Sequence, residues 1–243
     1  MELTIIIFLL GGLFLGWSLG ANDAANVFGT AVGTRMVQFK TAAIVCSIFV
    51  ILGAIISGSG TTETLGKLGS INALPGAFAA CVAAGLSVYI MTKSGLPVST
   101  TQAIVGAIIG WNLYTGSSTN IQVLITILGT WVLCPIIAGL LSMLFFVITK
   151  NFLQKAKLHI LRLDAYTRTA LLLVGAFGAY SLGANNIANV MGVFVPISPF
   201  TDINILNDFN FSSKEQLFLL GGIAIAVGVF TYSKKVMFTV GND

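Results

Sequence analysis

One carboxylate stands out in this sequence because it lies inside an apolar segment that contains no basic residue. Asp23 follows about 17 mostly apolar residues. An ionised carboxylate at the centre of a bilayer costs several kcal/mol unless it is paired or solvated. A bound cation would neutralise it, and Na⁺ is a hard cation that takes oxygen ligands. The alternative is a protonated Asp23 that is hydrogen-bonded inside the protein, which would itself suggest coupling to protons.

The surroundings of Asp23 occur twice. Segment 17–29 reads WSLGANDAANVFG and segment 180–192 reads YSLGANNIANVMG, so nine of thirteen positions agree at an offset of 163 residues. The repeat supplies further amide oxygens for a cation, those of Asn22, Asn26, Asn185, Asn186 and Asn189. Gly is a poor helix former, and Asn competes for backbone hydrogen bonds. We therefore expect both helices to break here, beside a cavity that satisfies the freed backbone.

A second cluster could bind an anion. Residues 95–102 read GLPVSTTQ and lie between the two apolar arms of segment 73–114. Pro97 cannot continue the helix before it, and Ser99 or Thr100 is suited to cap the helix after it. A helix N-terminus and its hydroxyls can bind an oxyanion without a fixed positive charge. The hydroxyl donors are those of Ser99, Thr100 and Thr101. The alternative is that these side chains only cap the helix.

The elements that position these residues must lie in a membrane. Hydrophobic residues make up 56% of the 243 residues and charged residues only 8%, whereas a soluble domain carries about 25% charged residues. Six runs approach the roughly 20 apolar residues that span a bilayer: 3–20, 41–58, 73–91, 121–149, 169–183 and 217–232. This predicts an all-α polytopic membrane protein, with 73–114 as a re-entrant helical hairpin.

Basic residues predict the orientation of the chain. They concentrate at Arg35 and Lys40, in segment 150–168 and at Lys234 and Lys235. The positive-inside rule puts these segments in the cytoplasm and the N-terminus outside, so the basic segment needs no nucleic-acid partner. The two copies of the repeat then cross the membrane in opposite directions. Inverted repeats of this kind are a recurrent construction of secondary transporters.

The same pattern divides the chain into three parts. Residues 1–149 form a first transmembrane repeat, 150–168 a basic cytoplasmic linker, and 169–243 a partial second inverted repeat. The three cysteines, Cys46, Cys81 and Cys134, are isolated in apolar runs, and Ser99 has no neighbouring base. We therefore predict that the protein is not an enzyme and has no cofactor.

These residues resemble the inorganic phosphate transporter family. The resemblance rests on the GANDxAN-type signature at 20–26, its near copy at 183–189, and the PVSTT-type hairpin at 97–101 followed by Gln102. It implies secondary active transport of inorganic phosphate in a cell membrane, coupled to Na⁺ or H⁺, around a site between broken helices and hairpins. Another oxyanion such as sulfate is an alternative substrate, because it accepts hydrogen bonds from the same hydroxyls.

The residues expected to bind each ion follow from the resemblance and, for Asn22 and Asn185, from the amide oxygens of the repeat. The phosphate ligands would be Asn26, Ser99, Thr100, Thr101 and Asn189, and the Na⁺ ligands would be Asn22, Asp23, Gln102, Asn185 and Asn186. The family's second half has its own hairpin, and no such segment occurs before Asp243. We therefore expect a homodimer or a completing polypeptide, with a truncated, non-transporting membrane subunit as the alternative.

Overall fold

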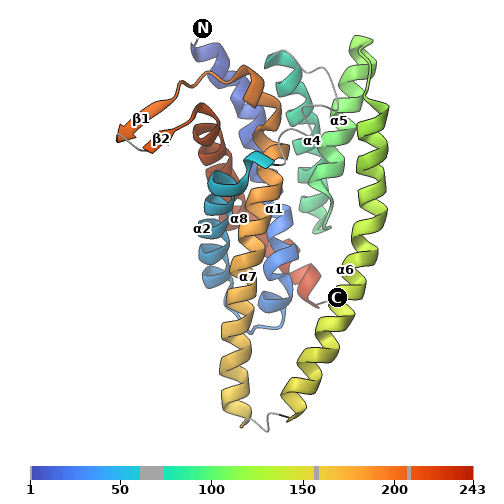
Figure 1. Cartoon of the computed structure of the whole chain (residues 1–243), viewed down its shortest axis with the longest axis vertical. Helices are drawn as coiled ribbons and strands as arrows, with labels where there is room; N and C mark the ends of the chain where they lie inside the picture. The colour runs from blue at the N-terminus through green and yellow to red at the C-terminus, as the bar shows by residue number, and fades with distance from the viewer. Residues whose placement is uncertain (1, 61–73, 156–158, 207–208, 243) are drawn as a thin grey trace.

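The fold was described from a computed structural model that covers residues 2–60, 74–155, 159–206 and 209–242. Nearly all of these residues are helical (Figure 1). The long helices are α1 (Glu2–Gly33), α2 (Phe39–Ser57), α4 (Leu74–Ser94), α5 (Thr100–Thr115), α6 (Ile121–Lys155), α7 (Ile160–Met191) and α8 (Ser213–Asn242). All but α5 are long and apolar enough to cross a membrane, which confirms the prediction of an all-α polytopic membrane protein.

The short elements and the lengths of two helices differ from the prediction, and two predicted positions lie outside the described residues. A short 3-10 helix, η1 (Gly192–Ile197), follows α7, and the strands β1 (Ile203–Leu206) and β2 (Phe209–Phe211) pair antiparallel before α8. No strand was expected in this chain. Helices α6 and α7 extend into the predicted linker from both sides. Position 73, where the hairpin was expected to begin, and Lys157 of the linker lie outside the described residues.

The expected helix breaks are absent, and this prediction was wrong. Helices α1 and α7 run continuously through both copies of the Gly-Ala-Asn motif. The glycines instead allow close helix contacts, because a Cβ at Gly20 would overlap the backbone carbonyl of Ile225, and one at Gly183 would overlap that of Val50. Small residues at such positions let membrane helices approach until their backbones touch.

The partner helices return these contacts in the same pattern. Gly228 of α8 lies against the backbone of Trp17, and Gly53 of α2 lies against the backbone of Tyr180. Trp17 and Tyr180 are equivalent positions of the repeat, so the α1–α8 pair and the α7–α2 pair use one packing arrangement twice. Figure 1 shows that α1 starts at the top and α7 at the bottom. The two repeated motifs therefore run in opposite directions, as inverted repeats do.

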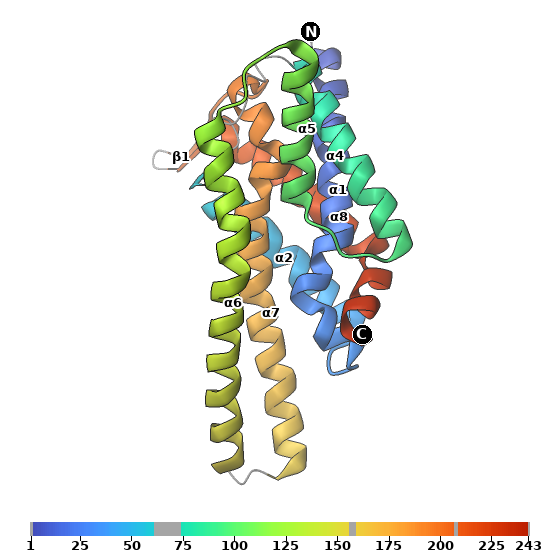
Figure 2. The same ribbon diagram turned by 90° about the vertical axis from the view of Figure 1, so that its right-hand side faces the viewer.

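Helices α4 and α5 form a hairpin that turns back inside the bundle. In Figures 1 and 2 the turn between them lies well above the lower ends of α1, α6 and α7. Helix α5 has only 16 residues, which at 1.5 Å per residue gives about 24 Å, short of the roughly 30 Å hydrocarbon core. The prediction of a helical hairpin in this segment is confirmed, and its tip is deep enough to meet the repeated motif.

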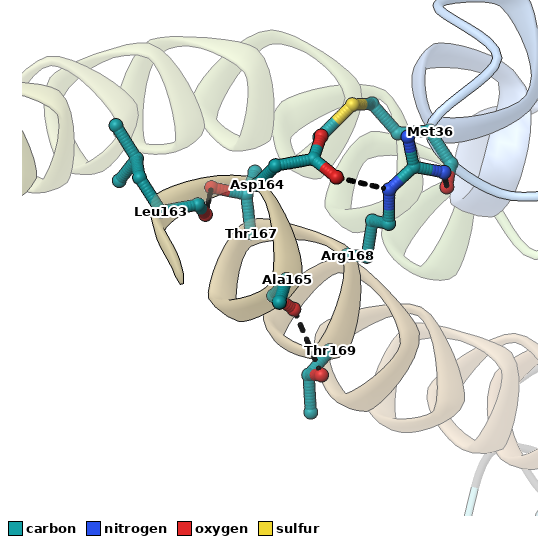
Figure 3. A network of polar contacts seen from close by, with 7 residues as sticks. All are labelled: Met36, Leu163, Asp164, Ala165, Thr167, Arg168 and Thr169. Carbon is teal, nitrogen blue, oxygen red and sulfur yellow. Dashed lines mark hydrogen bonds and ion pairs between the residues drawn. The ribbon is translucent and has the colours of Figure 1, made fainter. Parts of the chain in front are cut away.

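The three basic segments, around Arg35 and Lys40, at 150–168 and at Lys234 and Lys235, approach one another away from the N-terminal end of the molecule. Arg168 of α7 donates through Nη1 to the carbonyl of Met36, 2.7 Å away, and through Nε to Asp164, 2.8 Å away (Figure 3). The ammonium of Lys234 lies 6.0 Å from the centre of the Phe39 ring. The turn after α1, the start of α7 and the lower part of α8 therefore share one side of the protein, as the charge pattern predicts.

Candidate functional site

The turn of the hairpin is shaped by residues with restricted backbones. Gly95 has a φ of +83°, a left-handed conformation that glycine adopts without steric cost. Ser99 caps α5, and its hydroxyl accepts a hydrogen bond from the N–H of Gln102 at 3.2 Å. The first helical bond of α5 runs from Ala103 to the carbonyl of Ser99. Among the first residues of α5, Thr100 and Thr101 therefore have N–H groups that face out of the helix end, where an anion is favoured.

Asn22 of α1 holds this turn from the side. Its Nδ2 donates to the carbonyl of Leu96 at 2.9 Å and to the Thr92 hydroxyl at 2.8 Å, and its Oδ1 accepts from the N–H of Val98 at 2.9 Å. Asn22 and Thr92 are both fully buried. These bonds satisfy backbone groups of the turn that would otherwise be left unpaired, at about 1–3 kcal/mol each. Asn22 is thus a clamp on the hairpin, and its role as a cation ligand stays a prediction.

Asp23 meets the first residue of α5. The Thr100 hydroxyl lies 3.2 Å from Oδ1 and 3.3 Å from Oδ2 of Asp23, and the two residues are only 1% and 6% exposed, respectively. These distances are long for an O–H to oxygen bond, and a carboxylate has about four acceptor positions. No basic residue in the described part of the chain forms an ion pair with Asp23. A buried carboxylate with so few partners has oxygens to offer to a cation.

The next residue of the hairpin reaches the other copy of the motif. Nδ2 of Asn189 donates to the Thr101 hydroxyl and to Oδ1 of Asn186, each at 2.9 Å. Asn186 in turn donates to the carbonyl of Leu182 on its own helix. Asn186 and Asp23 are equivalent positions of the repeat, as are Asn189 and Asn26. Consecutive threonines therefore bind opposite halves of the protein, Thr100 to the first motif and Thr101 to the second.

A cavity of about 320 Å³ opens between α1 and the turn of the hairpin. Its lining residues come from α1 and from the hairpin: Asp23, Asn26, Pro97, Val98, Ser99, Thr100 and Thr101. The cavity combines a buried carboxylate, one amide, three hydroxyls and the N-terminus of α5. This set can hold a cation at Asp23 and an oxyanion at the hydroxyls. No Lys or Arg is among its lining residues. A fixed positive charge would bind an anion tightly and slow its release.

Five of the ten predicted ligands thus line one cavity, and a sixth, Asn189, is tied to it through Thr101. The other four are not among its lining residues. Asn22 is occupied with the turn and Asn186 with its neighbours, while Asn185 and Gln102 are exposed. The assignment of these four to cation binding is therefore still a prediction.

Two contacts of the hairpin were not anticipated from the sequence. Thr92 anchors Asn22, and Lys235 of α8 donates to the carbonyl of Lys93 at 2.7 Å, next to Gly95. Lysine near the C-terminus of a helix commonly bonds the last carbonyls. Here the lysine belongs to a helix 142 residues later in the chain, so no local pattern could reveal it.

Known proteins resemble this chain along most of its length. The sequence pattern of the phosphate transporter family matches residues 19–243. A protein of Pyrococcus furiosus described as a phosphate permease is 28% identical, over 98% of this chain and 76% of its own length. Another from Methanocaldococcus jannaschii is 27% identical, over 99% of this chain and 71% of its own length.

A solved structure shares the arrangement of the helices. That structure, described as the sodium-dependent phosphate transporter, has a TM-score of 0.75 and 26% sequence identity with this chain. The match covers 98% of this chain and 77% of the solved one. The likeness thus includes α1, the hairpin and α7, the elements that bring Asp23, Thr100, Thr101 and Asn189 together.

Proposed function

The chain belongs to the phosphate transporter family, and from this premise we propose that it carries inorganic phosphate across a membrane together with Na⁺. It is a multi-pass membrane protein and a transporter rather than an enzyme. The observation that carries the proposal is the cavity where Asp23 and three hydroxyls meet. One wall suits a cation and the other suits an oxyanion, so both ions can occupy one chamber.

The two ions divide the cavity between them in this proposal. Na⁺ binds at the Asp23 carboxylate, with Asn22, Gln102, Asn185 and Asn186 as further candidate ligands. Phosphate binds at Ser99, Thr100 and Thr101, with Asn26 and Asn189 on either side. Because Thr100 contacts Asp23, a cation at Asp23 brings positive charge close to the phosphate, which would otherwise face a carboxylate. This gives a physical reason for coupling the two.

Uptake of labelled phosphate into proteoliposomes tests the proposal. We expect an inward Na⁺ gradient to drive accumulation, and a K⁺ gradient of the same size to drive none. Uptake that ignores Na⁺ but follows a pH gradient would move the coupling to protons. If excess sulfate competes as well as unlabelled phosphate, the substrate is the wider class of tetrahedral oxyanions.

The orientation and the division of the chain are proposed on the same grounds. The three basic segments share one side, and we assign that side to the cytoplasm because cytoplasmic segments are enriched in Lys and Arg. The N-terminus then lies outside. Residues 1–149 form the first repeat, 150–168 the cytoplasmic linker, and the second repeat begins at 169.

A partner segment next to α7 is also part of the proposal. Asn22 is buried against the hairpin, whereas its equivalent, Asn185, is exposed in the described structure. A second copy of the chain or another polypeptide that placed a turn against Asn185 would complete the site symmetrically. Light scattering of the purified protein in detergent would distinguish a monomer from a dimer, and pull-down of a second polypeptide with the tagged chain would identify a heteromeric partner.

A further inference from the structure

A second cavity, of about 430 Å³, lies along the C-terminal half of α8. It is lined by Thr231, Tyr232, Lys234, Lys235 and Phe238. The cavity shares no lining residue with the one beside Asp23. Its connection to the hairpin runs through Lys235, whose side chain packs near Gly95 at the start of the turn.

The two lysines give this cavity a positive charge that no carboxylate of the described residues pairs with. In the part of the chain that the structure describes, neither Lys234 nor Lys235 forms an ion pair. Lys235 donates one bond, to the carbonyl of Lys93, and an ammonium has three donors. Lys234 lies over the face of Phe39 at 6.0 Å from the ring centre. Both lysines therefore retain donors for an anion.

An apolar stripe leads to these lysines along the same helix. Ile223, Val227 and Phe230 are 44%, 48% and 48% exposed, and their spacing, continued to Lys234, follows one face of α8. From Ile223 to Lys234 the helix rises roughly 16 Å. That length matches about 15 Å, half the thickness of the hydrocarbon core. The face therefore pairs an apolar surface one leaflet deep with a basic cavity at its end.

We propose that this face binds an anionic phospholipid, with the headgroup in the cavity at Lys234 and Lys235 and the acyl chains along Ile223, Val227 and Phe230. Charge complementarity selects a net negative headgroup, since a zwitterionic lipid brings its own cation. A soluble anion would fill only the basic cavity and leave the apolar stripe uncovered. The Tyr232 ring suits the boundary between headgroup and chain.

Lys235 would link such a lipid to the hairpin. Its ammonium would donate a hydrogen bond to the headgroup while it also donates to the carbonyl of Lys93 at the end of α4. Lipid binding can be measured without transport, so its test does not depend on the proposed function.

Tryptophan fluorescence can report on the site directly. Trp17 donates to Thr231, a lining residue, at 2.8 Å, and its ring lies 5.9 Å from that of Tyr232. With Trp111→Phe and Trp131→Phe introduced, Trp17 is the remaining tryptophan of the chain. The protein is reconstituted into phosphatidylcholine vesicles that contain increasing fractions of brominated phosphatidylglycerol or brominated phosphatidylcholine, and quenching is recorded.

We expect brominated phosphatidylglycerol to quench at a mole fraction on the order of tenfold lower than brominated phosphatidylcholine, as two lysines near a membrane surface would favour. The double variant Lys234→Gln/Lys235→Gln should lose this preference, whereas Lys234→Arg/Lys235→Arg should keep it. The matched control Lys150→Gln/Lys155→Gln removes the same charge from α6 and should keep it too.

Four outcomes would overturn the lipid assignment. Equal quenching by the two lipids would show that the site does not select for a negatively charged headgroup. A preference that survives in the Gln variant, or is lost in the α6 control, would place the effect elsewhere. Displacement of the brominated lipid by millimolar inorganic phosphate, but not by chloride at equal ionic strength, would mean that the cavity takes a free phosphate.

Discussion

The hydroxyl of Thr100 faces both carboxylate oxygens of Asp23, at 3.2 Å and 3.3 Å. One hydroxyl can donate only one proton, so at most one carboxylate oxygen is satisfied by Thr100 at a time. The other oxygen of the buried carboxylate is then open to a further partner. In the proposed function that partner is the coupling cation.

Asp23→Asn should abolish Na⁺-driven phosphate uptake. The amide keeps the shape but loses the charge that a buried cation needs, and losing one member of a buried ionic contact costs about 3 kcal/mol or more, roughly a hundredfold in binding. Uptake into proteoliposomes measures the effect. Asp164→Asn, which breaks only the exposed ion pair with Arg168, serves as the control. Unchanged Na⁺ dependence in Asp23→Asn would remove Asp23 from the cation site.

Thr101→Ala should weaken phosphate binding. The variant removes a proposed phosphate donor and also the acceptor that Asn189 now uses. One unsatisfied buried polar group costs about 1–3 kcal/mol, which corresponds to roughly 5–150-fold in affinity. Thr126→Ala is a matched control, since that hydroxyl bonds only to the carbonyl of Gln122 in the described structure. Equilibrium binding of labelled phosphate to both variants checks the difference, and equal affinities would exclude the hairpin from the site.

Asn22→Ala separates the two roles considered for this residue. As a clamp, Asn22 supports the carbonyl of Leu96 and the N–H of Val98. We expect faster hydrogen exchange in the turn and weaker phosphate binding, with the Na⁺ concentration for half-maximal uptake unchanged. A raised Na⁺ requirement with normal exchange in the turn would instead identify Asn22 as a cation ligand.

Gly20→Ala and Gly183→Ala should destabilise the protein to a similar extent. A methyl group at either position meets the backbone of a neighbouring helix, which cannot move aside as a flexible side chain could. Overpacking of this kind costs about 1–3 kcal/mol or more. Gly139→Ala in α6 meets open space and should be neutral or mildly stabilising. Thermal unfolding in detergent compares the three, and a neutral Gly183→Ala would contradict the equivalence of the two helix pairs.

Cysteine labelling tests the proposed orientation. In a variant with Cys46, Cys81 and Cys134 replaced by Ala, Lys155→Cys should be protected from a membrane-impermeant maleimide in intact cells. Ser118→Cys, in the connection between α5 and α6, should be labelled. Both native side chains are exposed in the structure, so burial would not explain protection. The reverse pattern would invert the assignment of sides.

The spans, the hairpin and the Ser99 cap could be predicted because their signals are local. Apolar length, Pro97 and a capping hydroxyl each depend on neighbours within one or two helical turns. The opposite directions of the two motifs followed from where the basic residues lie. The spans agree with the structure because the bilayer requires apolar helices of this length whatever their neighbours are.

The fate of the repeated glycines could not be predicted in the same way. Gly20 and Gly183 have the same local sequence whether a helix breaks there or packs closely, and only the presence of Ile225 and Val50 decides between the two. Asn22 presents the same difficulty, because its partners belong to a turn more than 70 residues away. The sequence identifies candidate residues, whereas their partners depend on which helices become neighbours.

Thr100 and Thr101 contact the two halves of the protein, and their Cα atoms are held 3.80 Å apart by the peptide unit between them. If α1 and α7 slide past each other by more than a hydrogen bond can stretch, one of the threonines must release its partner. The two hydrogen bonds of the hairpin therefore restrict how far α1 and α7 can shift relative to each other. A substrate bound to both hydroxyls would maintain this restriction until it dissociates.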